Sequence, residues 1–263
     1  MSRQRKDILE NMDFARYYAG VRELDISGQG PAYKAKCPFH PDTRASLSID
    51  AEKGLWYCHA GCGGGNVVQF HARLRGILFD EAREELEVFC GERHVVPEDD
   101  IKKAHAALMG APTMLDHLRK SRGLTAATAL EFRLGWKDDR WIIPIVERGY
   151  IFNAKMHDAT GGTLKSKALS WNTGMGEGRL FPYANLSREG TVYLFEGELK
   201  ALLAHQMGLL AITSTTGAAN WKPRFSELLK DRDVVVVYDT DQGGRSGAVT
   251  VARAVANRAK TVR

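Results

Sequence analysis

Acidic residues follow two apolar segments in the last third of the chain. Glu196 and Glu198 come directly after the first segment, and Asp239 and Asp241 come directly after the second. Carboxylate oxygens are the ligands that Mg²⁺ and Mn²⁺ prefer, and these ions also bind phosphate oxygens. If the fold brings the acids together, they predict a divalent-metal site able to act on phosphate groups.

A second set of possible metal ligands lies near the N-terminus. Two residues separate Cys37 from His40, and three separate Cys58 from Cys62. Paired thiols and imidazoles in Pro- and Gly-containing turns are typical of tetrahedral structural zinc, whereas small core cysteines would not need such turns. The pattern predicts one zinc ion held by these four residues. His59 could replace either neighbouring cysteine, although a solvent-exposed position suits it better.

The segments that precede the acids have the composition of buried parallel strands. Residues 191–195 and 234–238 are β-branched and aromatic without polar alternation, and residues 209–213 form a third such run. Apolar residues at helical spacing lie between them and predict a β-α-β-α-β-α order with right-handed crossovers. Because ligands bind at the carboxyl ends of parallel strands, we expect the acids to meet at one edge of this sheet.

The rest of the chain predicts three further regions. Residues 45–49 and 54–57 read as strands of a small ribbon that carries the cysteines, and two helices follow. The predicted organisation is a zinc ribbon at 1–90, a linker at 91–110, a mixed subdomain at 111–190 and the parallel-sheet domain at 191–263.

Composition permits several function classes and excludes one. The 263 residues carry a net charge of +5 and are 44% hydrophobic. A mildly basic chain can bind nucleic acid but need not. No segment is apolar and long enough to span a bilayer, and no apolar signal core is present, so we expect a cytoplasmic protein without membrane partners.

The cysteine segments resemble the CHC2-type zinc ribbon of bacterial and phage DNA primases. The resemblance rests on Cys-Pro-Phe-His at residues 37–40 and on Trp-Tyr-Cys followed by Cys-Gly-Gly-Gly-Asn within residues 56–66. The family more often has two residues between the second pair of ligands, where this chain has three.

The acidic segments resemble the Toprim domain shared by bacterial primases and topoisomerases. Its signature is a strand ending in Glu-Gly and a later strand ending in Asp-x-Asp, here Glu196-Gly197 and Asp239-Thr240-Asp241. Between the two regions, Arg-Gly-Leu-Thr at 122–125 and Phe-Arg-Leu-Gly at 132–135 are similar to the primase polymerase core. The resemblance to DnaG-type primases therefore covers nearly the whole chain.

This resemblance implies a fold and an activity. The fold would be α+β and α/β, with a zinc ribbon and a polymerase core that ends in a Rossmann-like Toprim domain. The activity would be synthesis of short RNA primers on single-stranded DNA by two-metal nucleotidyl transfer, with the template read by the zinc ribbon. Glu196, Asp239 and Asp241 would be the catalytic residues and the Mg²⁺ or Mn²⁺ ligands, beside the structural Zn²⁺.

The resemblance also implies partners. Lys155, Lys165 and Lys167 would bind the incoming ribonucleoside triphosphate, although a solvated strand face explains them equally well. A replicative helicase, fused or separate, is the expected partner. The chain would then be the N-terminal part of a phage or mobile-element primase-helicase, a fragment that is truncated within its Toprim domain, or a minimal version.

One residue departs from the family pattern and keeps a second function open. Lys200 stands where the family usually has an aspartate, and a positive charge there would weaken metal binding or contact phosphate instead. The alternative function is a non-catalytic or nuclease-like Toprim protein that binds DNA in a mobile-element replication system.

Overall fold

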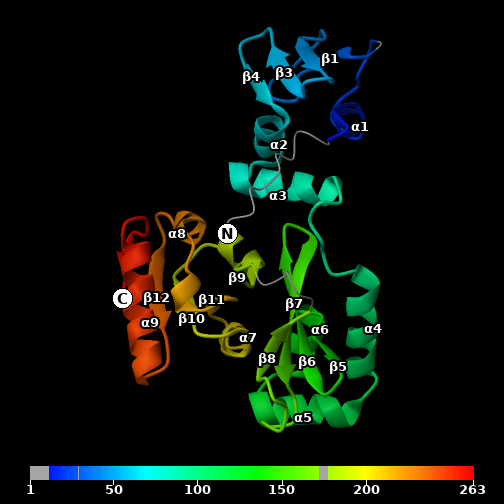
Figure 1. Ribbon diagram of the computed structural model, residues 1–263. Helices are drawn as coiled ribbons and strands as arrows, with labels where there is room; N and C mark the ends of the chain where they lie inside the picture. Colours follow the sequence, from blue (N-terminus) through cyan, green and yellow to red (C-terminus); the bar gives the residue numbers. More distant parts are fainter. Residues whose placement is uncertain (1–11, 29, 172–176) are drawn as a thin grey trace, which may run out of the picture. The chain divides into compact units, whose positions relative to one another are not determined.

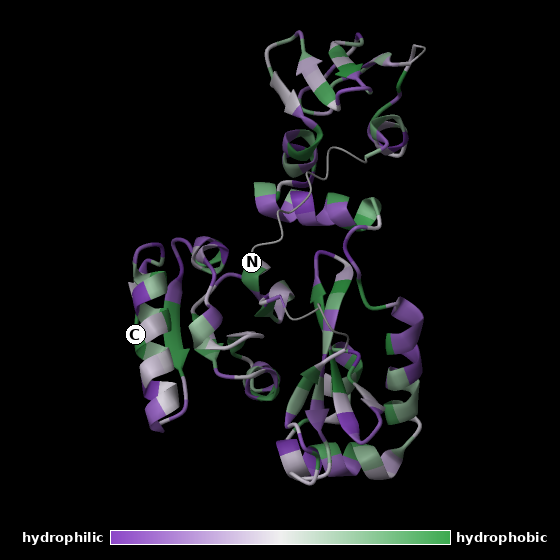
Figure 2. Ribbon diagram, in the orientation of Figure 1, coloured by the Kyte–Doolittle hydropathy of each residue, from purple (hydrophilic) through white to green (hydrophobic). Residues whose placement is uncertain are grey.

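The computed structural model describes residues 12–28, 30–171 and 177–263. The chain divides into two compact units, with the boundary between His94 and Val95. Figure 1 traces both units in sequence colours, and Figure 2 shows hydrophobic and hydrophilic residues alternating along helices such as α3 and α4. Over the described ranges, no helix has both the length and the apolar character needed to cross a membrane.

Over residues 12–28 and 30–94, the first unit is a four-stranded antiparallel ribbon with three helices. Its elements are α1 (Phe14–Ala19), β1 (Ala32–Ala35), β2 (Leu47–Asp50), β3 (Leu55–Cys58), β4 (Gly63–Asn66), α2 (Val67–Arg75) and α3 (Phe79–Phe89). The two predicted ribbon strands are confirmed as β2 and β3. The fourth strand was not predicted, because its residues are mostly glycine. A Cβ atom on Gly64 would lie 2.7 Å from the carbonyl oxygen of Trp56, so glycine allows β4 to pair with β3.

Aromatic side chains form the core of the first unit. The rings of Phe39, Trp56 and Phe70 lie 5.2 to 5.5 Å apart between centroids, and Tyr18 packs against Phe70 at 5.2 Å. Edge-to-face contacts at such separations add to the free energy of burying the rings. The ribbon, α1 and α2 are therefore held around one common core.

The second unit begins with an antiparallel sheet in the strand order β5-β6-β7-β8. Its elements are α4 (Glu98–Met109), α5 (Pro112–Arg122), α6 (Ala126–Glu131), β5 (Gly135–Lys137), β6 (Arg140–Glu147), β7 (Tyr150–Asp158) and β8 (Ala168–Ser170). Strands β6 and β7 pair antiparallel along nearly their whole length.

The second unit continues into a five-stranded sheet in the order β13-β12-β10-β11-β9, in which only β9 runs antiparallel to its neighbour. Its elements are β9 (Leu180–Phe181), η2 (Tyr183–Ser187), β10 (Val192–Phe195), α7 (Glu198–Gln206), β11 (Leu210–Ser214), η3 (Ala218–Asn220), α8 (Pro223–Leu228), β12 (Asp233–Val237), α9 (Gln242–Ala256) and β13 (Thr261–Val262). The predicted β-α-β-α-β-α order is confirmed.

Helices cover both faces of this sheet. Leu194 of β10 packs in one cluster with Phe225 of α8 and Val251 of α9. On the opposite face, Ala211 of β11 packs against Ala201 of α7. Figure 1 shows α9 beside β12 and α7 farther along the sheet. Since alternate strand residues point to opposite faces, the uninterrupted apolar strands follow from burial on both sides.

The predicted linker at 91–110 is wrong over most of its length. Val96 and three side chains of α4, Ile101, Ala104 and Leu108, are almost fully buried in the second unit. The polar residues 98–100 misled the prediction, because acids favour the first turn of a helix and do not mark a flexible segment.

The five-stranded sheet also begins before the predicted boundary at residue 191. Strand β9 pairs with β11, and Leu180 belongs to the same buried cluster as the central strands. Two residues are too few to give a periodic pattern, so a strand this short could not be recognised in the sequence.

Candidate functional site

The four predicted zinc ligands come together in the first unit. The ligand atoms of Cys37, His40, Cys58 and Cys62 all lie within 4.8 Å of one another. His40 Nδ1 lies 3.2 Å from Cys62 Sγ and 3.9 Å from Cys58 Sγ. Ligands of a tetrahedral zinc ion are separated by about 3.5 Å at ordinary Zn–S and Zn–N bond lengths. The donor set and its spacing therefore fit Zn²⁺.

The neighbouring histidine lies outside this cluster. The exposed His59 hydrogen bonds through Nε2 to the hydroxyl of Ser48 at 2.8 Å, and its ring lies against Tyr57. The alternative in which His59 replaced a cysteine is therefore not favoured by the geometry.

Asp42 organises the turn between the first two ligands and was missed in the sequence. Its Oδ2 accepts hydrogen bonds from the hydroxyl of Ser46 at 2.6 Å and from the backbone N–H of Cys37 at 2.8 Å. These bonds, that of Ser46 foremost, hold the pKa of the Asp42 carboxyl well below its usual range. His40 Nε2 lies 3.9 Å from the same carboxylate. Asp42 can therefore orient His40 with Nδ1 toward the sulfur atoms.

The thiol of Cys58 has a lowered pKa. Burial raises its pKa, but hydrogen bonds from the backbone N–H groups of Cys62 and Ala60 outweigh burial and lower the pKa to about 6. Because zinc binds thiolates, a low pKa favours metal binding at neutral pH.

The acids at the ends of β10 and β12 meet at one edge of the parallel sheet. Phe195 and Val237 are register partners, so the residues after them lie on neighbouring strands. The carboxylate of Glu196 accepts a hydrogen bond from the backbone N–H of Asp239 at 3.4 Å. The expectation that these two acids lie together, although distant in sequence, agrees with this contact.

The side chains of Asp239 and Asp241 each have a defined partner at this edge. Asp239 forms an ion pair with Lys200 of α7, and both side chains are half exposed. Asp241 is the N-cap of α9, and its Oδ1 accepts from the backbone N–H of Gly244 at 2.7 Å. A Cβ atom on Gly244 would lie 2.2 Å from the carbonyl oxygen of Asp239, so glycine allows α9 to begin directly against this backbone.

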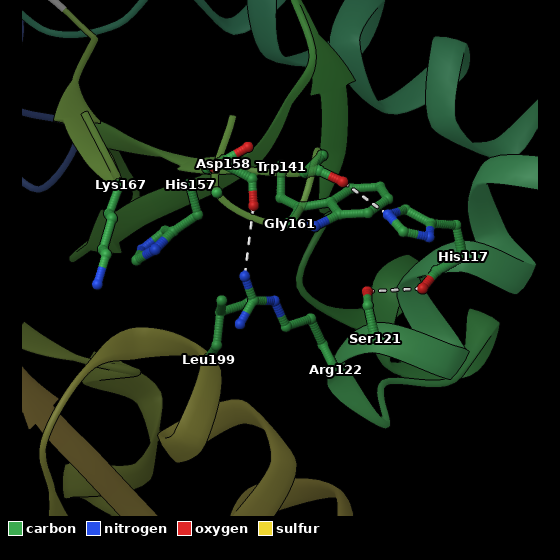
Figure 3. A pocket seen from close by; sticks show the side chains of 11 residues that line it. His117, Ser121, Arg122, Trp141, His157, Asp158, Gly161, Lys167 and Leu199 are labelled. Carbon is green, nitrogen blue, oxygen red and sulfur yellow. Dashed lines mark hydrogen bonds between the residues drawn. The ribbon is translucent and has the colours of Figure 1, made fainter. Parts of the chain in front are cut away.

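A basic pocket of about 480 Å³ lies in the same unit. Figure 3 shows Arg122 extending toward the carbonyl oxygen of Asp158, at 3.4 Å, with His157 and Lys167 beside it. The lining residues are His117, Ser121, Arg122, Trp141, His157, Asp158, Ala159, Gly161, Gly162, Lys167 and Leu199. Two of them, Arg122 and Lys167, are cationic and can donate hydrogen bonds to an anion, whereas Nε2 of each histidine is already paired, with the carbonyl oxygen of Ala159 and with Glu198.

Of the three lysines predicted to bind nucleotide, the structure places one in this pocket. Lys167 lines it, Lys165 is exposed outside it, and Lys155 lies on β7 two positions before His157, on the same face of the strand. The spacing of the three lysines in the sequence could not show which of them lines the pocket. Arg122 and His157 were not predicted as site residues.

The first turn of α7 borders both the pocket and the acidic edge. The Nε2 atom of His157 lies 3.1 Å from the carboxylate of Glu198, and both side chains are largely buried. Leu199 lines the pocket, and Lys200 contacts Asp239. Three consecutive residues thus connect the basic pocket with the acids.

The ribbon of the first unit carries a shallow groove of about 680 Å³. Its lining residues are Ala32, Tyr33, Lys34, Ser48, Ile49, Asp50, Leu55, Trp56, Tyr57, Gly64 and Gly65. Tyr57 is 56% exposed, whereas Trp56 is buried in the aromatic core. Of these two neighbouring aromatic residues, only Tyr57 can present its ring to a ligand.

Comparisons with known proteins match a zinc-finger family model to the first unit and show similarity to bacterial DNA primases along most of the chain. Residues 6–100 match the family model of the CHC2 zinc finger. The DNA primase of Helicobacter pylori strain J99 is 26% identical over 302 residues, which cover 92% of this chain and 53% of that protein. The DNA primase of Geobacillus stearothermophilus is 24% identical over 307 residues, covering 87% of this chain and 51% of that protein. The chain thus spans about half the length of these relatives.

Solved primase structures are similar in outline. The Aquifex aeolicus primase, comprising zinc binding and RNA polymerase domains, has a TM-score of 0.49 at 20% identity and covers 97% of this chain and 77% of that chain. A DnaG primase catalytic domain bound to single-stranded DNA has a TM-score of 0.48 at 17% identity, covering 60% of this chain and 64% of that chain.

Proposed function

Because the chain belongs to the DnaG-type DNA primase family, we propose that it synthesises short RNA primers on a single-stranded DNA template. In this reaction the 3′ hydroxyl of one ribonucleotide attacks the α-phosphate of the next, and pyrophosphate leaves. The observation that carries the proposal is the first turn of α7, which borders an anion-binding pocket on one side and paired acids on the other.

The acids would hold the divalent metal. Glu196, Asp239 and Asp241 offer carboxylate oxygens, the donors that Mg²⁺ and Mn²⁺ prefer, and each carboxylate has oxygen lone pairs beyond the contacts described above. A divalent ion bound there would supply positive charge where negative charge develops on the transferring phosphate. These three residues are thus our proposed catalytic site.

The pocket would hold the triphosphate of the incoming ribonucleotide. Lys167 and Arg122 can donate charge-assisted hydrogen bonds to phosphate oxygens, and Glu198 fixes the ring of His157 at the border of the pocket. These groups orient the nucleotide with its α-phosphate toward the neighbouring acids. Positioning of this kind removes much of the entropic barrier to joining two nucleotides.

The ribbon groove would hold the template. Tyr57 offers an exposed ring on which a base can stack, and Lys34 lies in the same groove to attract the DNA backbone. On the resemblance alone, we also propose a replicative helicase as the protein partner.

One contact favours the second candidate function, a Toprim protein without polymerase activity or with nuclease-like activity. The ammonium of Lys200 already neutralises Asp239, an acid that polymerisation would need for its metal. Such a protein would bind DNA through the ribbon and synthesise no primers.

Template-dependent incorporation of ribonucleotides on short single-stranded DNAs tests the proposal. Asp239→Ala should lower primer synthesis about 10²-fold or more, because a well-placed charge-stabilising group is worth that much. DNA affinity should hold or rise slightly, since a negative charge is removed. Glu189→Ala is the matched control, because Glu189 is an exposed acid that precedes β10 and so lies at the opposite end of the strand. If folded Asp239→Ala keeps the wild-type rate, the acidic site is not catalytic. If the wild type itself makes no primers, the second function replaces the first.

A further inference from the structure

Trp141 is a buried aromatic residue near the start of β6, and only 2% of it is exposed. It is the register partner of Trp136 on β5 and of His157 on β7, so the three side chains form one row on the same face of the sheet. The ring of His117 on α5 lies against the indole, at 5.5 Å between centroids. The neighbouring strands and α5 therefore fix the orientation of this indole.

The indole nitrogen of Trp141 is a buried donor without a hydrogen-bond partner among the described residues. Such donors are rare in folded proteins, because each has lost its hydrogen bonds to water. Trp141 lines the basic pocket, and Figure 3 shows the nitrogen on the lower edge of the ring, the side on which Ser121 and Arg122 lie in this view. A ligand that brings an acceptor atom into the pocket could therefore satisfy this donor.

The other neutral donors that line the pocket already have acceptors. The Nε2 atoms of His117 and His157 are paired as described above. The hydroxyl of Ser121 donates to the carbonyl oxygen of His117 at 2.7 Å. Among the neutral side-chain donors of the lining residues, all of which the structure describes, the indole N–H of Trp141 is the one left for a ligand.

The charges around the pocket favour an anionic acceptor. Arg122 and Lys167 are the cationic lining residues, and Asp158 is the acidic one. The carboxylate of Asp158 accepts hydrogen bonds from the backbone N–H of Thr160 at 2.7 Å and from its hydroxyl at 2.6 Å, so it is engaged by its own loop. Phosphate oxygens would satisfy both the cations and the indole, whereas an uncharged base or sugar would leave the cations without a counter-charge.

We propose that the indole N–H of Trp141 donates a hydrogen bond to a phosphate oxygen in this pocket, and that the pocket accordingly binds a polyphosphate chain and not a base. The inference rests on the proposed function, in which this pocket holds the triphosphate of the incoming ribonucleotide, and it adds a residue that recognises the phosphates. It requires that the phosphate chain bind without base or sugar.

Nuclear magnetic resonance of the zinc-loaded wild type, with isotope-labelled tryptophan, tests the contact. The chain has five tryptophans, so their indole N–H signals can be followed one by one. Inorganic tripolyphosphate should move the Trp141 indole proton downfield, because a hydrogen bond to an anionic oxygen deshields the proton. The Trp136 signal should shift far less, since that nitrogen is also buried and unpaired but Trp136 does not line the pocket. Adenosine should not move the Trp141 signal.

Trp141→Phe tests the same bond by affinity, because phenylalanine keeps an aromatic ring and lacks the N–H. Its affinity for tripolyphosphate, measured by calorimetry, should fall about tenfold or more, the effect of one hydrogen bond to a charged group. Trp136→Phe is the matched control and should bind as the wild type does. Thermal unfolding shows whether each variant is folded, and the titration of the wild type decides alone if Trp141→Phe is not.

Three outcomes would overturn the inference: no binding of tripolyphosphate by the wild type, binding that leaves the Trp141 signal in place, or equal affinities in the two folded variants. Primer synthesis by the same wild-type protein separates the inference from the proposed function. Primers made by a chain whose Trp141 signal does not respond contradict the inference and leave the proposed function intact. A response to tripolyphosphate without primer synthesis contradicts the proposed function and leaves the polyphosphate site intact.

Discussion

Asp42 controls the zinc ligands although it need not touch the metal. Its carboxylate fixes the backbone of Cys37 and faces Nε2 of His40. We predict that Asp42→Asn lowers zinc affinity by about 10- to 100-fold, the range found when a partner of a metal ligand is removed. Competition with a chromophoric chelator measures it. The exposed Asp25 supplies the control Asp25→Asn, and equal zinc affinity in the two variants would show that Asp42 has no such role.

Lys167 and Lys165 differ in their relation to the basic pocket, so they make a matched pair. Lys167→Ala should raise the KM for ribonucleoside triphosphate by about tenfold or more, because a charge-assisted hydrogen bond to phosphate is lost. Lys165→Ala removes the same charge from an exposed position outside the pocket and should change KM less than about twofold. Steady-state kinetics with a fixed template measures both. Equal effects would place the triphosphate elsewhere.

At the residue scale the zinc ligands were predictable from the sequence, whereas the residues at the basic pocket were not. The ligand pairs are close in sequence and lie in turns, so their spacing carries the signal. The contact between His157 and Glu198 joins residues 41 positions apart, and no local pattern marks either one. Asp42 did leave a local signal, an aspartate after proline in a turn, which is typical of side chains that bond to nearby N–H groups.

At the scale of the elements, the groove on the ribbon leads to a prediction about binding of single-stranded DNA. Tyr57 of β3 is the exposed aromatic residue of this groove. Tyr57→Ala should weaken binding of a short single-stranded DNA by about tenfold, since one stacked base contributes about 1–3 kcal/mol. Tyr57→Phe keeps the ring and should bind as the wild type does. Fluorescence anisotropy measures both, and an unaffected Tyr57→Ala variant would exclude this face.

Strands were predictable from sequence where burial on both faces left an unbroken apolar run. Strands β10 and β12 have such runs, and their parallel order was enough to predict that the acids following them lie at one edge of the sheet. Strand β4 is largely glycine and β9 has two residues, so neither has a pattern of its own. Each forms because a neighbouring strand offers free backbone groups to pair with.

At the scale of the whole molecule, the boundary between the two compact units falls at His94, near the N-terminal end of the predicted linker at 91–110. Since α4 packs into the second unit, we predict that limited proteolysis cuts near the boundary at His94 and spares α4. Two resistant fragments should appear by mass spectrometry. Removing zinc with a chelator should abolish the resistance of the N-terminal fragment only, because the metal contributes folding free energy there. Cleavage within α4 would contradict this packing.

The carboxylate of Asp241 has two competing interactions, the N-cap hydrogen bond of α9 and the proposed binding of metal. Asp241 closes the first turn of the helix by accepting the amide hydrogen of Gly244. A metal that recruited that same oxygen would release the amide to solvent, so the start of α9 would loosen as the ion bound. Hydrogen–deuterium exchange at Gly244 would then accelerate on addition of Mg²⁺, whereas the amides in the middle of α9 would keep their protection. The helix terminus would thus act as an internal reporter of whether the neighbouring acids are occupied.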